Sequence, residues 1–257
     1  SQSSQVDVLR PLTNPTVLAT NPPHQAVVAL PLPLVTVTFD QDMLADSASD
    51  PNSVTNPANY TLISSAGHAA TVAAVTYDAA TRTALLQVQG LFPEQYTLTV
   101  FGSIHGVNDL PMAGVYAVTF QAVNDVSNYA AVKVTDTRLD RSKQTVTYEV
   151  SVTNTNDYDL LLPLLLTLDP AAFVQGGPQG AQSQSPDGRW LISLSANVPG
   201  GVKLAPGQST TGLTVRLVTP GFESADYQPG VIGVPGDNAK PVFTSPPLTA
   251  ATAGQTY

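Results

Sequence analysis

The segment Val35-Thr-Val-Thr-Phe39 alternates apolar and hydroxylated side chains. In an extended strand successive side chains point to opposite faces, so its valines and phenylalanine share one face and its threonines share the other. Residues 96–100, Tyr-Thr-Leu-Thr-Val, repeat the scheme. Alternation of apolar and hydroxylated side chains with a period of two predicts β-strands that bury one face, and helical periodicity is nearly absent from the chain.

Further short alternating segments surround these two, and glycine or proline separates them. They lie at residues 59–64, 71–78, 83–89 and 116–122. Six or seven short strands in about 110 residues, with turn residues at this spacing, are typical of an immunoglobulin-like sandwich.

A second set of strands is expected at residues 131–138, 144–154, 161–168, 189–195, 211–218 and 228–234. Within 144–154, Val146 and its alternate neighbours share one face and Glu149 lies on the other, so a slip of one residue would bury a carboxylate. The sequence therefore predicts an all-β chain of two tandem immunoglobulin-like β-sandwiches. Its length of 257 residues fits this division, because most domains hold about 100–150.

Residues 161–168, Leu-Leu-Pro-Leu-Leu-Leu-Thr-Leu, are apolar on both faces. We interpret them as a central strand covered on both sides, and the alternative is an exposed adhesive patch. The run is too short to span a membrane, which takes about 20 apolar residues, and Pro163 interrupts it. Neither a transmembrane helix nor a signal peptide is expected in the sequence, since residues 1–5 have neither a charged nor an apolar region.

Charged residues make up only 11% of the chain, against roughly 25% in an ordinary soluble domain. The formal net charge is −9, and the 10 lysines and arginines are scattered. Binding to nucleic acid or to an anionic membrane surface needs clustered cations, so neither partner is expected, nor is direct insertion into a membrane. Cysteine is absent, so packing or bound ions must stabilise the fold.

Several motifs of the first half recur in a known family: Asn21-Pro-Pro23, residues 35–39 followed by Asp40-Gln-Asp-Met43, Asn59-Tyr-Thr-Leu62, Val75-Thr-Tyr-Asp78, residues 96–100, and Val107-Asn-Asp-Leu110 before Val118-Thr-Phe120. With these motifs, residues from about 19 to 122 resemble the bacterial Ig-like domain of S-layer and other surface proteins.

Two further resemblances follow. Tyr148-Glu-Val-Ser-Val-Thr-Asn-Thr155, Leu204-Ala-Pro-Gly-Gln-Ser209 and Leu213-Thr-Val-Arg-Leu217 make residues 133 to about 234 similar to fibronectin-III-like or CARDB-like modules of secreted bacterial proteins. Val242-Phe243 and Ala253-Gly-Gln-Thr-Tyr257 resemble the start of an Ig- or cadherin-like repeat. The predicted organisation is a lead-in segment or edge strand at 1–15, a bacterial Ig-like sandwich at 16–123, a linker at 124–128, a second sandwich at 129–237, and a linker with the start of a further repeat at 238–257.

These resemblances imply a spacer, stalk or adhesive role and no catalysis. We expect a non-enzymatic structural or adhesive segment of a large secreted bacterial cell-surface protein, acting outside the cell as a stalk, a spacer, or a subunit of a filament or layer. Its expected partners are the neighbouring domains of the same chain, with self-assembly or surface polysaccharide as further hypotheses. The alternative is an accessory carbohydrate-binding module of a secreted enzyme or adhesin. Its candidate sugar-stacking residue is Trp190, the single tryptophan, for which the other interpretation is a core anchor.

No catalytic site is expected. His24, His68 and His105 lie near proline or glycine and are interpreted as turn residues, and without cysteine a structural zinc site is not expected. The only glutamates are Glu94, Glu149 and Glu223, and nothing in their spacing predicts the paired carboxylates of a glycosidase.

Calcium is the one cofactor that the residue pattern suggests. Oxygen-rich loops occur at Asp40 and Asp42 and in Asn154-Thr-Asn-Asp-Tyr-Asp159. A calcium ion takes about six to eight oxygen ligands, often from several loops. The candidate ligands are Asp157 and Asp159, then Asp40 and Asp42, and a polar turn is the alternative interpretation of each loop.

Overall fold

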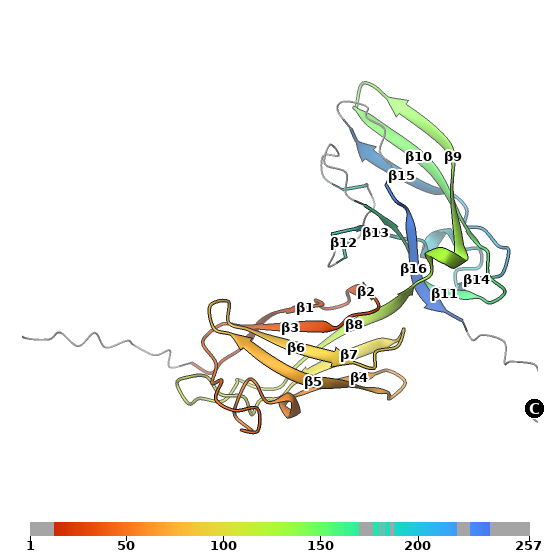
Figure 1. The fold of residues 1–257 in the computed structure, drawn as a ribbon. Helices are drawn as coiled ribbons and strands as arrows, with labels where there is room; N and C mark the ends of the chain where they lie inside the picture. Colours follow the sequence, from red (N-terminus) through yellow and green to blue (C-terminus); the bar gives the residue numbers. More distant parts are fainter. Residues whose placement is uncertain are drawn as a thin grey trace, which may run out of the picture.

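The structure is a computed structural model that describes residues 13–169, 177–179, 181, 183–185, 188–219 and 227–236 (Figure 1). The lead-in up to residue 12 and the predicted repeat at 238–257 lie outside these residues. The chain is all-β, as predicted, and its strands form two sandwiches joined by short 3-10 turns and loops. Within the described ranges, no helix has the length and apolar character needed to cross a membrane.

The first sandwich consists of two facing sheets. One sheet has the order β1 (Val17–Asn21), β3 (Leu34–Phe39), β6 (Thr83–Gln89) and β5 (Ala69–Asp78). The other contains β4 (Tyr60–Ser64), β7 (Gln95–Val100) and β8 (Tyr116–Asp125), with β2 (Val27–Ala29) parallel to β8. Strand β5 takes part in both sheets, because its first residues pair with β4 and the rest pair with β6.

The alternating faces of these strands form the first core. In β3 the side chains of Val35, Val37 and Phe39 are buried, whereas the threonines between them are partly exposed. Tyr96 of β7 and Phe120 of β8 stack with ring centroids 6.0 Å apart. Burying a large apolar side chain stabilises a fold by about 1.5–3 kcal/mol, so the period-two pattern accounts for this sandwich.

The second sandwich packs a three-stranded sheet against a larger one. The smaller sheet has the order β15 (Leu213–Val218), β10 (Thr145–Asn154) and β9 (Ala130–Asp140). The facing sheet contains β16 (Gly230–Pro235), β11 (Leu160–Leu168), β13 (Trp190–Ser193) and β12 (Ser183–Gln184), with β14 (Lys203–Leu204) beside β11. In β10, Val146, Val150 and Val152 are buried and the Glu149 carboxylate accepts a hydrogen bond from exposed Thr214, which confirms the predicted register.

Strand β11 is covered on both faces, as its apolar pattern predicted. Leu164 and Leu166 belong to the second core, whereas Leu165 belongs to a separate cluster with Val123 of β8. Both edges of β11 are also paired, with β16 on one side and β13 on the other. The strand is therefore central, and the alternative of an exposed adhesive patch is wrong.

Two features differ from the sequence-based expectation. Strands β1 and β2 are short, lie outside the predicted set, and are fixed by pairing with β3 and β8. Residues 124–128, expected as a linker, are built into the fold: β8 continues to Asp125, and the 3-10 turn η2 (Ser127–Tyr129) leads directly into β9. The reason is that Asn124 and Asp125 pair with β16.

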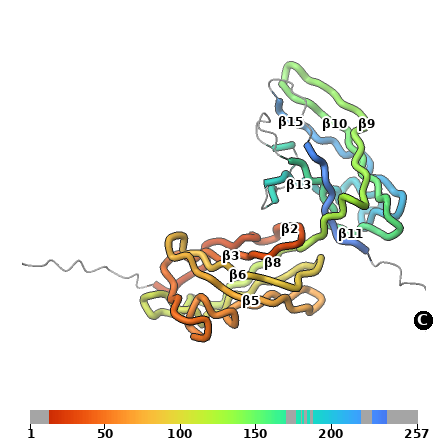
Figure 2. Tube along the Cα trace, viewed as in Figure 1, coloured from red at the N-terminus to blue at the C-terminus, as the bar shows by residue number. Residues whose placement is uncertain are grey.

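The two sandwiches meet at a steep angle, which gives the described chain the outline of a bracket (Figure 2). The first sandwich forms one arm. The second rises from the end of β8 and forms the other arm.

Gly230, at the start of β16, lies where several side chains leave no room for a larger residue. A Cβ atom there would approach Thr167 Oγ1 to 2.7 Å and Ser127 Oγ to 2.9 Å. Because such contacts force the neighbours to shift, we expect Gly230→Ala to lower the free energy of unfolding by about 1–3 kcal/mol, measured by chemical denaturation. Gly114→Ala, where an added Cβ meets no atom within 4 Å, is the matched control. Equal stability of the two variants would contradict the close packing at Gly230.

Candidate functional site

The joint between the sandwiches is a continuous piece of β-sheet. Strand β8 pairs antiparallel with β16, with Asn124 opposite Gly233 and Asp125 opposite Ile232. The next residue continues the ladder, because the Val126 N–H donates to a β16 carbonyl at 2.8 Å. Just before this stretch, the residues of β8 at 121–123 pair with β2. The end of the first sandwich is therefore hydrogen-bonded directly to the second.

A separate hydrophobic cluster fills the joint. Its members are each at most 4% exposed, and they are Val123, Leu165, Leu191 and Ile232. The side chains of Val27, Ala29 and Val234 pack against them. Both sandwiches contribute, since β2 and β8 belong to the first and β11, β13 and β16 to the second. Separating the sandwiches would expose several apolar side chains, each worth about 1.5–3 kcal/mol of burial, so the joint resists bending.

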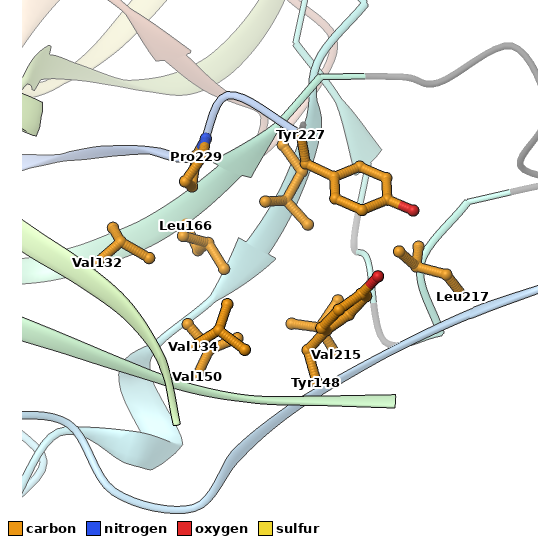
Figure 3. Close-up of a pocket in the computed structure, with 10 residues that line it drawn as sticks. Val132, Val134, Tyr148, Val150, Leu166, Val215, Leu217, Tyr227 and Pro229 are labelled. Atoms are coloured by element: carbon orange, nitrogen blue, oxygen red, sulfur yellow. The ribbon is translucent and has the colours of Figure 1, made fainter. Parts of the chain in front are cut away.

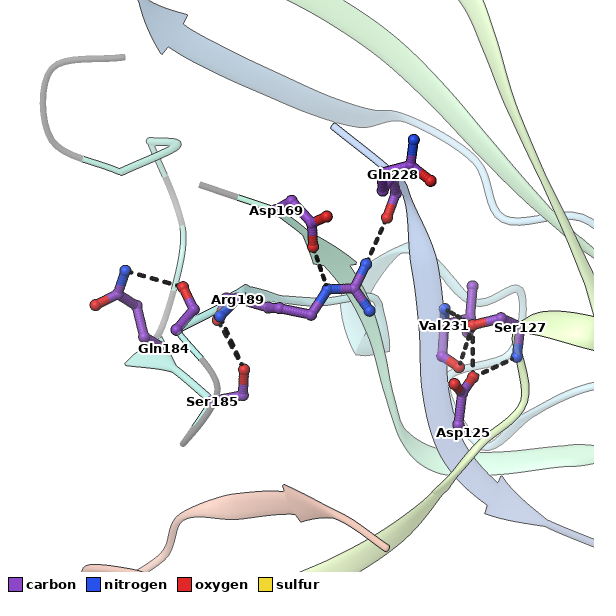
Figure 4. A network of polar contacts seen from close by, with 9 residues as sticks. Asp125, Ser127, Asp169, Gln184, Ser185, Arg189, Gln228 and Val231 are labelled. Carbon is purple, nitrogen blue, oxygen red and sulfur yellow. Dashed lines mark hydrogen bonds and ion pairs between the residues drawn. The ribbon is translucent and has the colours of Figure 1, made fainter. Parts of the chain in front are cut away.

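Polar contacts fix the turn beside this cluster (Figure 4). Asp125 Oδ1 accepts hydrogen bonds from the Ser127 N–H at 2.9 Å and from Ser127 Oγ at 2.6 Å. The Val231 N–H of β16 in turn donates to Ser127 Oγ at 2.9 Å. Further along the second sandwich, Arg189 forms an ion pair with Asp169 at 2.6 Å. The chain therefore leaves β8 in one defined direction.

None of the four joint residues was a candidate from the sequence. The available signal was the double-sided apolar run of β11, which required a cover on its outer face. Nothing in the sequence identified β8 and β2 as that cover, because the cluster joins distant residues: Val123 lies 42 positions before Leu165 and 109 positions before Ile232.

The candidate calcium ligands Asp40 and Asp42 lie together just after β3, and each has a partner. Asp40 accepts hydrogen bonds from the Thr16 N–H at 2.9 Å and from Thr16 Oγ1 at 2.8 Å. Asp42 forms an ion pair with Arg82 at 2.9 Å. These carboxylates hold the loop after β3 to the start of β1 and to the turn between β5 and β6.

The other candidates, Asp157 and Asp159, lie in the loop between β10 and β11 of the second sandwich. Asp157 is exposed, and Asp159 Oδ2 lies 2.6 Å from Lys203 Nζ. Asn154 Nδ2 orders the loop by donating to two backbone carbonyls, at 2.8 and 2.9 Å. The candidates thus lie in two separate loops, one in each sandwich. Among the described residues no group of three or more His, Asp or Glu side chains could hold a metal ion, so the calcium hypothesis rests on the sequence alone.

Trp190 of β13 is half-buried and packs against the second core. A Cβ atom added at Gly177 would lie 2.7 Å from its indole ring, so the backbone approaches the ring closely. The next residue, Leu191, points the other way, into the joint. This placement favours the core-anchor interpretation, and sugar stacking on Trp190 stays a prediction.

The histidines make separate surface contacts. His68 Nδ1 lies 2.9 Å from Glu94 Oε1, and His105 Nδ1 lies 3.3 Å from Asp109 Oδ1. A hydrogen bond from Ser64, followed by one from His68, holds the pKa of Glu94 below its usual value. The Ser64 hydroxyl and the His68 imidazole therefore bind the same carboxylate.

An apolar pocket of about 240 Å³ opens between the two sheets of the second sandwich (Figure 3). Valines and leucines of β9, β10, β11 and β15 line it, together with Tyr148, Tyr227 and Pro229. The two tyrosine rings meet edge to face, with centroids 6.0 Å apart. Burial, and then the neighbouring Tyr148, raises the pKa of Tyr227 to about 12. The hydroxyl therefore stays protonated at physiological pH, and none of the described residues that line the pocket is charged.

We expect calcium to leave thermal stability unchanged, because Asp42 and Asp159 are already neutralised by Arg82 and Lys203. The measurement is the melting temperature in calcium and in EDTA. A melting temperature that rises in calcium, and no longer rises in Asp157→Asn, would instead support a calcium site.

Comparison with known proteins matches the first sandwich to a family. Residues 12–122 match the family described as bacterial Ig-like domain. No curated protein matches the chain.

Solved structures of three different proteins contain chains similar to this one. CopC from Methylosinus trichosporium OB3b is 17% identical, with 42% of this chain and 95% of that chain covered and a TM-score of 0.29. Native alpha-2-macroglobulin from Escherichia coli, spanning domains MG0-NIE-MG1, is 11% identical, with 61% and 45% covered and a TM-score of 0.32. The N-terminal part of the bacterial S-layer protein SbsC is 12% identical, with 56% and 41% covered and a TM-score of 0.32. The chain spans less than half the length of the latter two, and at these scores the likenesses carry no functional argument.

The family match confirms the resemblance of the first half of the chain to the bacterial Ig-like domain. The fibronectin-III-like or CARDB-like resemblance and the cadherin-like one have no such match and stay predictions. Strands β1 to β8 have the two-sheet architecture that the family description implies. Residues 12–122 thus match the bacterial Ig-like family, and their described part, from residue 13 on, forms an Ig-like sandwich.

Proposed function

We propose that the chain is a non-enzymatic structural segment of a large extracellular bacterial protein, in which it holds neighbouring modules at a fixed angle. The observation that carries this proposal is the joint. A ladder between β8 and β16 and a shared hydrophobic cluster connect the two sandwiches. A spacer needs such a joint, because a loose one would let its modules reorient freely.

The family match supports the location and the class of protein. The resemblance described above is to the Ig-like domain of bacterial surface proteins, and residues 12–122 match that family. The acidic residues of the described part support a structural role as well. Asp40, Asp42, Asp125 and Asp159 each stabilise a loop or turn through a hydrogen bond or an ion pair.

Rigidity of the joint can be tested with spin labels, because the chain has no cysteine of its own. Cysteines would replace exposed Ala66, in the turn between β4 and β5, and exposed Arg141, in the turn between β9 and β10. We expect electron–electron distance measurements on the labelled chain to give one narrow distribution. A broad distribution would contradict a fixed angle.

Two core variants distinguish an effect on the rigidity of the joint from an effect on overall stability. Leu191 is 1% exposed and lies in the joint, whereas Leu194 is 0% exposed and lies in the second core. Each change to alanine is expected to cost about 2–5 kcal/mol through the cavity it leaves. Only Leu191→Ala should broaden the distance distribution between the sandwiches. Equal broadening by both variants would show that the cluster has no special part in the joint.

Surface location needs its own measurement. An antibody raised against the purified chain should label intact cells of the bacterium that produces it. Labelling only after the cells are broken would contradict an extracellular role.

A further inference from the structure

We propose that the two sandwiches respond differently to tension along the chain, and that the second opens at lower force and lengthens the chain while the first stays folded. This inference rests on the proposed function, because a spacer in a surface protein is pulled through its two ends. The response itself is a property of strand directions, which the structure defines.

The first sandwich is loaded along its strands. Tension from the N-terminal side reaches β2 at its start, and tension from the other side reaches β8 at its end. The two strands are parallel, with Val27 opposite Gln121 and Ala29 opposite Val123. Backbone hydrogen bonds of 2.7–2.8 Å extend this ladder on both sides. Parallel strands pulled from opposite ends slide past each other, so their hydrogen bonds share the load and must break together.

Strand β1 adds to this resistance. It pairs antiparallel with β3 from Val17, opposite Phe39, to Asn21, opposite Thr36. A pull on its N-terminal end acts along its axis and again loads the pairs in shear. The Asp40 carboxylate holds Thr16, the residue just before β1, through two hydrogen bonds.

The chain takes a different path through the second sandwich. Among the described residues, the chain crosses it in six main strands of alternating direction, β9, β10, β11, β13, β15 and β16. An even number of crossings returns the chain to the end where it came in. Ala130, at the start of β9, lies opposite Asn154, and Leu160, at the start of β11, lies opposite Pro235 at the end of β16. Figure 1 shows the C-terminal side of β16 leaving at the corner of the bracket, not at the far tip of the second arm.

Tension therefore acts across the strands of the second sandwich and pulls them apart from one end. Strand β16 is antiparallel to β8 and to β11, so the pull on Gly236 and the pull through β8 act at the same end of the β8–β16 ladder. The pairs of Pro235 with Leu160 and of Gly233 with Asn124 carry the load first, and the following pairs carry it in turn. Opening pairs one at a time takes less force than breaking a whole ladder together.

The consequence is a chain that extends in steps. Residues 126–236 lie between the joint and the end of β16. Opened fully at ~3.5 Å per residue, this stretch of about 110 residues adds roughly 390 Å of length. The Ig-like first sandwich keeps its fold during this step, so the segment limits the tension on its neighbours.

Single-molecule force spectroscopy on the full chain, held by its two ends, tests this order. Because both sandwiches release similar lengths, an insertion of about 20 flexible residues marks each one and adds roughly 70 Å to its step. One insertion lies between Arg141 and Ser142 in the second sandwich, and its control lies between Ala66 and Gly67 in the first. We expect the 141 insertion to lengthen the lower-force step and the 66 insertion to lengthen the higher-force step. The reverse assignment, or one step lengthened by both, would overturn the proposal.

A change of pulling direction tests whether the direction of the strands determines which sandwich opens first. Attachment at Arg141→Cys, at the far tip, and at the C-terminal end pulls β16 along β11 and loads their pairs in shear. The second sandwich should then open at a several-fold higher force than with end-to-end pulling. Equal force in both directions would contradict the argument from strand direction. Either failure leaves the antibody labelling result unchanged, so the surface role and the mechanical inference can fail separately.

Discussion

Both sandwiches are built on the outer edge of strand β8. Backbone N–H and carbonyl groups at an edge need partners, and an open apolar edge invites association. Here β2 pairs with residues 121–123 of that edge, and β16 pairs with the next two. One strand therefore closes the first sandwich and anchors the second, which fixes the angle between them.

The leucine-rich strand β11 supplies apolar side chains to the contact between the two sandwiches. Leu164 and Leu166 fill the second core, while Leu165 and its neighbour Leu191 on β13 face the first sandwich. If the first sandwich were removed, these outward leucines would be exposed to water. The second sandwich is thus stabilised by the first through a surface that an isolated module would leave uncovered.

The scarce charged residues act locally in this architecture. Asp42 with Arg82, Asp159 with Lys203 and Asp169 with Arg189 are ion pairs with partly exposed members. Exposed pairs of this kind contribute about 0–1 kcal/mol each, so they position loops more than they stabilise the fold. Stability rests on the three hydrophobic clusters, and the mechanical behaviour that we infer follows from how the strands between these clusters are ordered.

The long strands could be predicted from the sequence, because an amphipathic strand is a local pattern. Val35 to Phe39 and Val146 to Val152 alternate so clearly that only one face can be buried, and β6 spans Thr83–Gln89, the residues that the pattern predicted. The remaining features depend on contacts between distant segments of the chain. Asn124 and Asp125 are polar and resemble a linker, but partners on β16, more than 100 residues later, make them part of a sheet. Asp42 and Asp159 resemble calcium ligands, but Arg82 and Lys203, 40 and 44 residues away, lie against them. A local pattern shows which side of a strand avoids water, whereas the identity of the covering group depends on how distant segments of the chain pack together.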